Sequence, residues 1–419
     1  MIKFDFLNID LTPSDDKYDL AGFGKRDLSE VQFGVREVRM RLVWFKTHSS
    51  DDLIVVSLDT LYFPTWLADE IYRYFEEAYG IDSRFIICNA THTHSSPNLT
   101  IELFGNVDTV FKNHILNTIK DKMPKLGSNF IKSRLIYSSC DLGKDLLIGR
   151  RKCVPDYFNF TFKKKALFLP NEHQVIDNGL RVLSVTDESG RVVSTIFNLS
   201  CHPVFASNTK ISSDFPGVVS KNLERSGAVF SLFLQGFCGD VRPKVVTKGF
   251  FKGTLRQRVK SFLYGDVFGV PTTNDLECFS ERVADKVQEV AKSGVELTSE
   301  FKAKVFELTL VSDTGAYKKL IKIKLVRLDS VILISIPAEV LSPYLLILKE
   351  KFPEFEFLPL GFADDMIGYL PSPRQYLEGG YEVTSSINYG WDSPISESSL
   401  RALVDSLCEN VSDLLREAK

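Results

Sequence analysis

The order of apolar segments in the first hundred residues does most to restrict the fold. The mostly apolar run 53–58 is followed by a segment, about 64–79, in which apolar residues recur at helical spacing. A second apolar run, 85–88, comes next. Alternation of strand and helix at this spacing is typical of layered α/β proteins. The chain is therefore expected to form an α/β fold of layered, mixed β-sheets flanked by helices.

Later segments continue this alternation. Further strands are predicted at residues 1–10, 35–45, 192–199, 228–235, 303–311, 320–327, 330–337 and 355–360, and further helices at 107–119, 280–293, 340–351 and 396–417. The region from about 125 to 195 indicates only short, irregular strands, 244–270 indicates a loop or lid, and 361–391 indicates a loop. Because no linker or repeat interrupts the pattern, residues 1–419 are expected to form one large domain.

The composition argues against several classes of protein. Charged residues make up 25% of the chain and the net charge is only −3, so no general attraction to nucleic acid is indicated. No apolar run is long enough to cross a bilayer, and the amino terminus lacks the features of a signal peptide. The seven cysteines form no CxxC pair, and several lie in apolar strands. We expect a soluble, cytoplasmic protein with no nucleic-acid partner and no integral membrane segment.

Four apolar strands end in residues that bind metal ions or carry charge. His92 and His94 follow 85–88, His202 follows 192–199, Asp240 and Arg242 follow 228–235, and Glu339 follows 330–337. Side chains two positions apart share a face of a strand, so His92 and His94 are expected to point the same way. Because ligands gather beyond the carboxyl ends of strands in layered α/β proteins, these four groups can meet at one site.

Two histidines and a glutamate from three such strand ends suit a hydrolytic zinc site. Zinc lowers the pKa of a bound water towards about 7, and a remaining histidine can take or give the proton. The residues also leave a simpler interpretation open. In it, one histidine is a hydrogen-bonded core residue and the other is solvated.

Several motifs, taken together, resemble the catalytic domain of the neutral (non-lysosomal) ceramidases, which are zinc-dependent amidases. Thr91–Ser95 resembles the T-H-T-H-S motif of that family, and Asn198–Pro203 with Ser212–Gly217 resembles its N-x-x-x-H-P and S-S-D-Y-P-G pair. Leu234–Val241 resembles its L-Q-x-x-x-G-D-V motif, and Ile336–Glu339 resembles its P-G-E motif. Tyr369–Glu382 resembles its tail, in which two tyrosines are twelve residues apart. The motifs occur in the family's order over nearly the whole chain.

The resemblance implies a zinc ion and its ligands, which would be His92, His202, Glu339 and Tyr369. It also implies that His94 and Tyr381 are the acid–base and oxyanion-stabilising groups, and that Arg150 lies near the site.

Other polar residues have less defined roles. Asp59 and Asp214 either orient ligands or act as structural caps. His48, His114 and His173 match no motif and are expected at the surface.

The chain departs from the family at Gly239–Lys244, where members that cleave ceramide have serine in place of Arg242. Arginine brings a fixed cation with five donors, so recognition of ceramide's hydroxyl groups is not expected to survive. We also expect no counterpart of the family's carboxy-terminal accessory domain. Arg242 is therefore expected to act beside the metal in catalysis and, with Arg150, to bind a carboxylate or phosphate of the substrate.

These observations predict a zinc-dependent hydrolase that cleaves a linear amide, an N-acyl or N-acetyl group, with metal-activated water. The expected partner is a small-molecule or glycan amide, such as an N-acyl amino sugar or sugar acid, rather than ceramide. A ceramidase proper, an acyl esterase at the same metal site, and a non-catalytic metal-containing binding protein are the alternatives.

Overall fold

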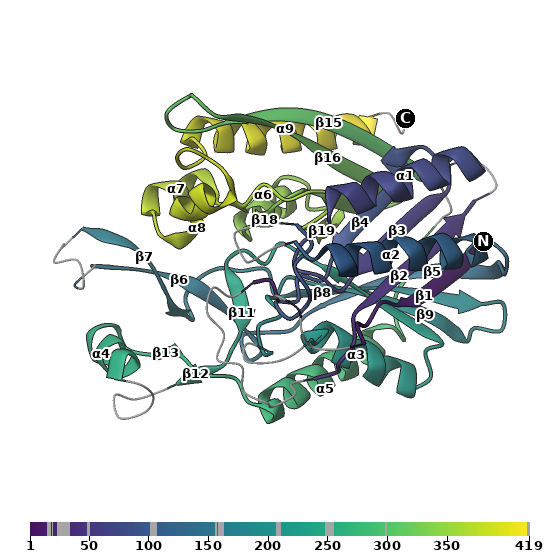
Figure 1. Ribbon diagram of the computed structural model, residues 1–419, viewed down its shortest axis with the longest axis horizontal. Coiled ribbons are helices and arrows are strands. Elements are labelled where there is room, and N and C mark those ends of the chain that lie inside the picture. The colour runs from purple at the N-terminus through teal and green to yellow at the C-terminus, as the bar shows by residue number, and fades with distance from the viewer. Residues whose placement is uncertain are drawn as a thin grey trace.

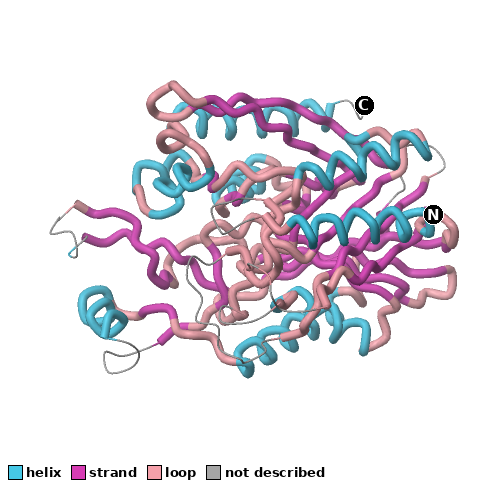
Figure 2. Tube along the Cα trace, viewed as in Figure 1, coloured by secondary structure: helices cyan, strands magenta, loops and turns pink. Residues whose placement is uncertain are grey.

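The structure is a computed structural model of the 419-residue chain. It describes residues 1–14, 18, 20–22, 34–47, 51–100, 107–155, 157, 163–206, 211–247, 255–297 and 300–416, apart from the side chain of Arg256. Strands occupy the middle of the molecule and helices lie outside them (Figures 1 and 2).

The largest sheet within the described residues has nine strands, in the order β10-β9-β8-β5-β1-β2-β3-β4 with β14 also paired to β5. Its strands are β1 (Ile2–Asp10), β2 (Arg39–Lys46), β3 (Leu53–Leu58), β4 (Ile86–Ala90), β5 (Ile131–Asp141), β8 (Gly179–Asp187), β9 (Val192–Leu199), β10 (Phe230–Gln235) and β14 (Val295–Leu297). Pairing is antiparallel except at the two ends, where β3–β4 and β9–β10 are parallel. Every residue of β3, β4 and β10 is buried, which explains why these strands read as continuous apolar runs.

A second sheet has the order β15-β16-β17-β19. Its strands are β15 (Phe301–Val311), β16 (Lys318–Leu328), β17 (Val331–Ser335) and β19 (Glu356–Leu360). It shares a hydrophobic core with α6 (Pro343–Lys351) and α9 (Glu397–Arg416). The apolar stripes of α1 (Thr65–Tyr79) and α2 (Thr109–Lys122) face the nine-stranded sheet, and those of α3 (Asp214–Arg225) and α5 (Thr273–Val290) pack with β8, β9 and β10.

Smaller elements extend to the left of Figure 1. They are the sheet β11 (Val241–Pro243), β6 (Leu147–Pro155) and β7 (Lys164–Asn171), the pair β12 (Val246–Thr247) and β13 (Val267–Phe268), and α4 (Leu255–Tyr264). Nearer the centre, β18 (Glu339–Val340) pairs with β20 (Tyr369–Leu370), and α7 (Pro373–Glu378) and α8 (Tyr381–Thr384) follow.

The predicted α/β class with layered mixed sheets is confirmed, whereas the single domain 1–419 stays a prediction. Three regional predictions are wrong. The region 125–195 holds long strands, with β5 alone spanning eleven residues. The described parts of 244–270 include α4 and a strand pair, and 361–391 includes β20, α7 and α8. The helix predicted at 280–293 begins earlier, at Thr273, and the one predicted at 340–351 begins later, at Pro343.

Two buried asparagines tie the strand ends together. The Asn89 side chain, at the end of β4, donates to the carbonyls of Gln235 (3.3 Å) and Gly361 (2.6 Å) and accepts from the Gln235 amide (2.8 Å). Asn198, in β9, donates to the carbonyls of Leu234 (3.0 Å) and Pro359 (2.8 Å). The carboxyl ends of β4, β9, β10 and β19 therefore meet, and the site residues lie just beyond them.

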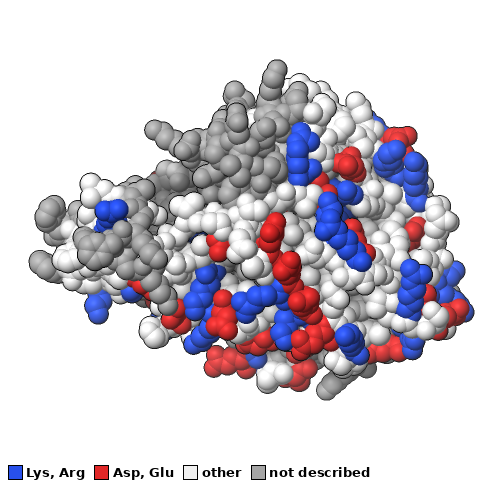
Figure 3. All heavy atoms as spheres, turned by 90° about the horizontal axis from the view of Figure 1, so that it is seen from below, with Lys and Arg blue, Asp and Glu red and all other residues white. Residues whose placement is uncertain are grey.

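The surface carries no single dominant charge on the face drawn in Figure 3, where acidic and basic side chains are interspersed. This distribution fits the net charge of −3. Among the residues that the structure describes, no helix is both long and apolar enough to span a bilayer.

Candidate metal centre

His92 and His94 lie in the turn that follows β4. The strand ends at Ala90, and His92 takes a left-handed backbone conformation with φ 64°. The prediction that both histidines share one face of a strand is therefore wrong, because strand alternation stops before either residue. The turn still brings the two rings together, with 3.2 Å between their Nε2 atoms. The buried His92 ring also stacks on Phe362 at a centroid distance of 3.9 Å.

Three histidine rings are oriented by backbone carbonyls. Nδ1 of His92 lies 2.8 Å from the Leu61 oxygen, Nδ1 of His94 lies 3.1 Å from the Gly22 oxygen, and Nδ1 of His202 lies 2.7 Å and 3.1 Å from the oxygens of Cys238 and Val241. Because a carbonyl oxygen only accepts, each Nδ1 must carry a hydrogen. In a neutral imidazole this leaves a lone pair on Nε2, directed away from the carbonyl and available to a metal ion.

Glu339 brings a carboxylate to these nitrogens. Its Oε1 lies 2.7 Å from Nε2 of His202 and 3.8 Å from Nε2 of His92, and it receives no hydrogen bond within the described residues. One nitrogen from each of His92, His94 and His202 lies within 4.8 Å of the other two. The cluster thus gathers three ring nitrogens and a carboxylate oxygen in one place. Nitrogen and oxygen atoms in this arrangement fit a zinc ion.

Burial sets the charge state of the cluster. It lowers the pKa of His92 to about 3, although the nearby Glu339 opposes the shift. Burial, reinforced by Arg150 and Arg242, also holds the pKa of His202 well below its ordinary value. The pKa of Glu339 is raised by burial, against the opposing effect of His92. Both imidazoles are therefore neutral near pH 7, which is the form that binds metal ions.

Tyr369 and Tyr381 both lie at the cluster. Tyr369 is buried in β20 and is the register partner of Glu339. Tyr381 begins α8, and its ring centroid lies 5.5 Å from that of Tyr369. The preceding Gly380 has φ 99°, and a Cβ there would lie 2.6 Å from the Ala166 oxygen, so glycine is required for this turn. Tyr381 remains 47% exposed and can reach a substrate.

Arg150 is buried against the same cluster rather than solvated. Its Nη1 donates to Nε2 of His202 at 3.0 Å, and its Nη2 lies 3.7 Å from Oε1 of Glu339. Its Nε donates to Oε1 of Glu382 at 2.9 Å. Burial lowers the pKa of Arg150, but Tyr369, Glu382 and Glu339 outweigh burial and raise it well above the ordinary value.

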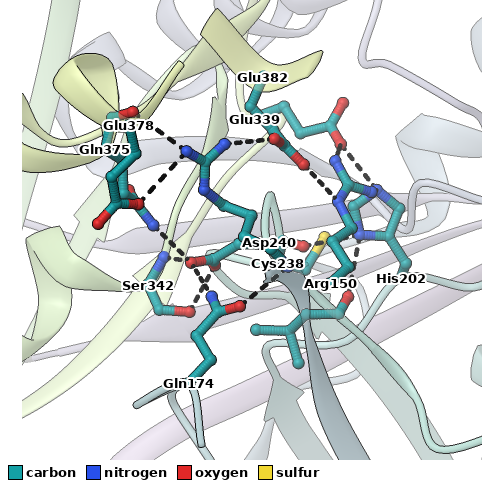
Figure 4. A network of polar contacts seen from close by, with 12 residues as sticks. Arg150, Gln174, His202, Cys238, Asp240, Glu339, Ser342, Gln375, Glu378 and Glu382 are labelled. Carbon is teal, nitrogen blue, oxygen red and sulfur yellow. Dashed lines mark hydrogen bonds and ion pairs between the residues drawn. The ribbon is translucent and has the colours of Figure 1, made fainter. Parts of the chain in front are cut away.

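Sequence reasoning missed the buried network that holds Arg150 (Figure 4). Glu382 also accepts a short hydrogen bond from Nη1 of Arg151, whose Nη2 donates to the carbonyls of Gln375 and Gly379. The carboxylate of Asp240 accepts from the Ser342 amide and hydroxyl and from the side-chain amides of Gln174 and Gln375. The only sequence signal for Glu382 and Arg151 is that each directly follows a predicted site residue.

Arg242 lies in β11, opposite Ile148 of β6. Its guanidinium carbon stands over the rings of Phe168, at 5.3 Å, and Phe268, at 4.6 Å. Within the described residues its side chain contacts these two rings and no histidine, although its charge helps to lower the pKa of His202.

Asp214 and Asp59, the remaining predicted residues, accept hydrogen bonds from the backbone. Asp214 accepts from the amides of Ala206 and Phe215, both at 2.7 Å, at the start of α3. Asp59 accepts from the Arg39 amide at 3.0 Å. These contacts support the structural interpretation of both carboxylates.

The other three histidines are not part of the described cluster. His114 and His173 are exposed, as predicted, and His48 lies outside the described residues.

Comparisons with known proteins bear on the fold. No model of a protein family matches the chain, and no curated protein matches it either. Solved structures do match it, among them the neutral ceramidase from Pseudomonas aeruginosa, with a TM-score of 0.74, and a ceramidase complexed with C2, with a TM-score of 0.76. Each is 16% identical in sequence, and each match covers 100% of this chain and 75% of the other. The chain therefore has a neutral ceramidase-like fold.

Proposed function

We propose that the protein is a zinc-dependent hydrolase that cleaves a linear amide. One observation carries the proposal. The Nε2 atoms of His92, His94 and His202 converge on Oε1 of Glu339, an oxygen that receives no hydrogen bond from a described residue. Each histidine Nδ1 is hydrogen-bonded to a backbone carbonyl. Ring nitrogens and a carboxylate oxygen gathered in this way are the ligand atoms that zinc binds in proteins. The neutral ceramidase-like fold supports the same reaction class by analogy.

The residues proposed to hold the ion are His92, His202, Glu339 and Tyr369. Bound zinc would supply Lewis acidity and a hydroxide nucleophile at neutral pH. His94 is instead assigned to proton transfer. Its Nδ1 is fixed by the Gly22 carbonyl, so proton exchange is assigned to Nε2.

Four side chains of the protein are assigned roles in amide cleavage. Nε2 of His94 takes a proton from the attacking water and later gives one to the departing amine. The Tyr381 hydroxyl donates to the oxygen of the former carbonyl as negative charge develops there. Arg150, fixed by Glu382, orients His202 and Glu339 and contributes to substrate binding. Arg242 adds positive charge at the edge of the site, where it favours a substrate that carries an anionic group.

The proposed substrate is a polar or anionic N-acyl compound, such as an N-acyl amino sugar or sugar acid, rather than ceramide. Arg242 stands where the ceramide-cleaving family has serine, and a cation at that position disfavours an uncharged lipid. All seven cysteines are free, which supports the proposal that the enzyme acts in the reducing cytoplasm.

The test is a hydrolysis panel on protein that has been stripped with a chelator and reloaded with zinc. The panel contains an N-acetylated amino sugar, an N-acetylated sugar acid, a short-chain ceramide and an O-acetyl ester. We expect hydrolysis of the sugar amides that is lost on chelation and restored by zinc. Preference for ceramide would indicate a ceramidase, and preference for the ester would indicate an esterase. Bound zinc with no turnover of any compound would indicate a binding protein and overturn the proposal.

A further inference from the structure

Arg242 is a cation with no counterion among the residues that the structure describes. No acidic side chain pairs with its guanidinium in the described part of the chain, and no side chain or carbonyl there accepts its hydrogen bonds. Arg150 and Arg151 differ in this respect, because both form ion pairs with Glu382. Burial, and then the charge of Arg150, lower the pKa of Arg242 to about 10. The group stays protonated near pH 7, so its charge is uncompensated.

Two aromatic rings hold this guanidinium in place. Phe268 of β13 and Phe168 of β7 lie 4.6 and 5.3 Å from its central carbon. Cation–π contacts with two rings restrict a guanidinium and leave its N–H groups without an oxygen acceptor. Restricting the side chain in advance reduces the entropy lost when a ligand binds. The Phe168 side chain is 39% exposed, so the subsite is open to solvent.

The backbone ties this group to the metal cluster. Val241, next to Arg242, accepts from Nδ1 of His202 at 3.1 Å. The guanidinium carbon of Arg150 lies 5.2 Å from the same Phe168 ring, so one ring contacts both arginines. A ligand group held by Arg242 would therefore remain within one small molecule's length of the cluster.

We propose that Arg242, flanked by Phe168 and Phe268, is the subsite that binds an oxyanion, a carboxylate or a phosphate, carried by the amide substrate. The planar fork of arginine matches either group with two parallel hydrogen bonds. The inference rests on the proposed amide hydrolysis and narrows its substrate class. An uncharged lipid would leave the cation unpaired.

The experiment compares three amides that share one scaffold: N-acetylglucosamine, its 6-phosphate, and the corresponding uronic acid. Arg242→Gln removes the charge, Arg242→Lys keeps the charge but removes the fork, and Arg374→Gln is the matched control. The Arg374 side chain is 90% exposed and lies outside the cluster. We expect Arg242→Gln to lower the ratio of kcat/KM for an anionic over the neutral amide by about 10–100-fold, mainly through KM. Arg242→Lys should lose less, and Arg374→Gln should not change the ratio.

The two anionic compounds distinguish a carboxylate from a phosphate. An unchanged ratio in Arg242→Gln would overturn the subsite while leaving amide hydrolysis intact. If no amide is hydrolysed, the proposed function is wrong. Calorimetry with inorganic phosphate and with the uronic acid, on the metal-free protein, then tests whether Arg242 binds an oxyanion. Binding that Arg242→Gln abolishes would support it, and no binding, or binding that this variant leaves unchanged, would overturn it.

Discussion

Removal of the Glu382 carboxylate tests the network that holds Arg150. Glu382 is the shared partner of Nε of Arg150 and Nη1 of Arg151, and all three side chains are at most 4% exposed. Glu382→Ala leaves two buried guanidinium groups without this partner. Loss of one partner from a buried ion pair costs about 3–5 kcal/mol. At about 2.1 cal/mol/K of unfolding entropy per residue, a chain of this length has about 0.9 kcal/mol/K, so Tm should fall by about 3–6 °C.

The matched control is Glu378→Ala. Glu378 lies 3.6 Å from Nη2 of Arg151, but its side chain is 27% exposed, so its loss should cost less than about 1 kcal/mol. Unfolding in denaturant, followed by circular dichroism, gives the free energies of both variants. Equal losses in the two variants, or a loss below about 1 kcal/mol in Glu382→Ala, would refute the reasoning. Wild-type hydrolysis in Glu382→Ala would show that Arg150 needs no positioning.

Two further variants test separate parts of the account. Burial raises the pKa of Asp214 from 3.8 to about 6, so between these values the folded protein binds more protons than the unfolded chain, and stability falls as pH rises. The stability of the wild type relative to Asp214→Asn should therefore drop by about 2 kcal/mol between pH 4 and pH 7 in denaturant titrations. A difference that stays constant with pH would contradict the raised pKa of the buried Asp214 carboxyl. His94→Ala should lower kcat by about 10²–10⁴-fold while keeping its zinc, and loss of zinc from that variant would make His94 a ligand instead.

Much of the fold could be predicted, because long apolar runs correspond to buried strands and apolar residues at helical spacing correspond to the buried face of a helix. The predicted runs 53–58 and 192–199 coincide with β3 and β9, and the stripe at 64–79 with α1. The short helices α7 and α8 were missed because six and four residues show no periodicity. A signal for α7 was present, since Ser372 and Gln375 form a capping box with Pro373 between them.

The site was predictable where residue type and position past a strand indicated chemistry. His92, His94, His202 and Glu339 meet as expected, yet His92 and His94 do so through a left-handed turn that strand alternation does not describe. The partners that fix the site were not predictable. Glu382 contacts Arg150 across 232 residues, and no local pattern encodes that pairing.

The central claim is that these side chains bind one metal ion. The most direct measurement is zinc content by atomic spectroscopy after equilibrium dialysis, for the wild type, His202→Ala and the exposed-residue control His114→Ala. The account predicts about one zinc per chain in the wild type and in His114→Ala, and almost none in His202→Ala. Equal zinc in all three proteins, or none in the wild type, would contradict it.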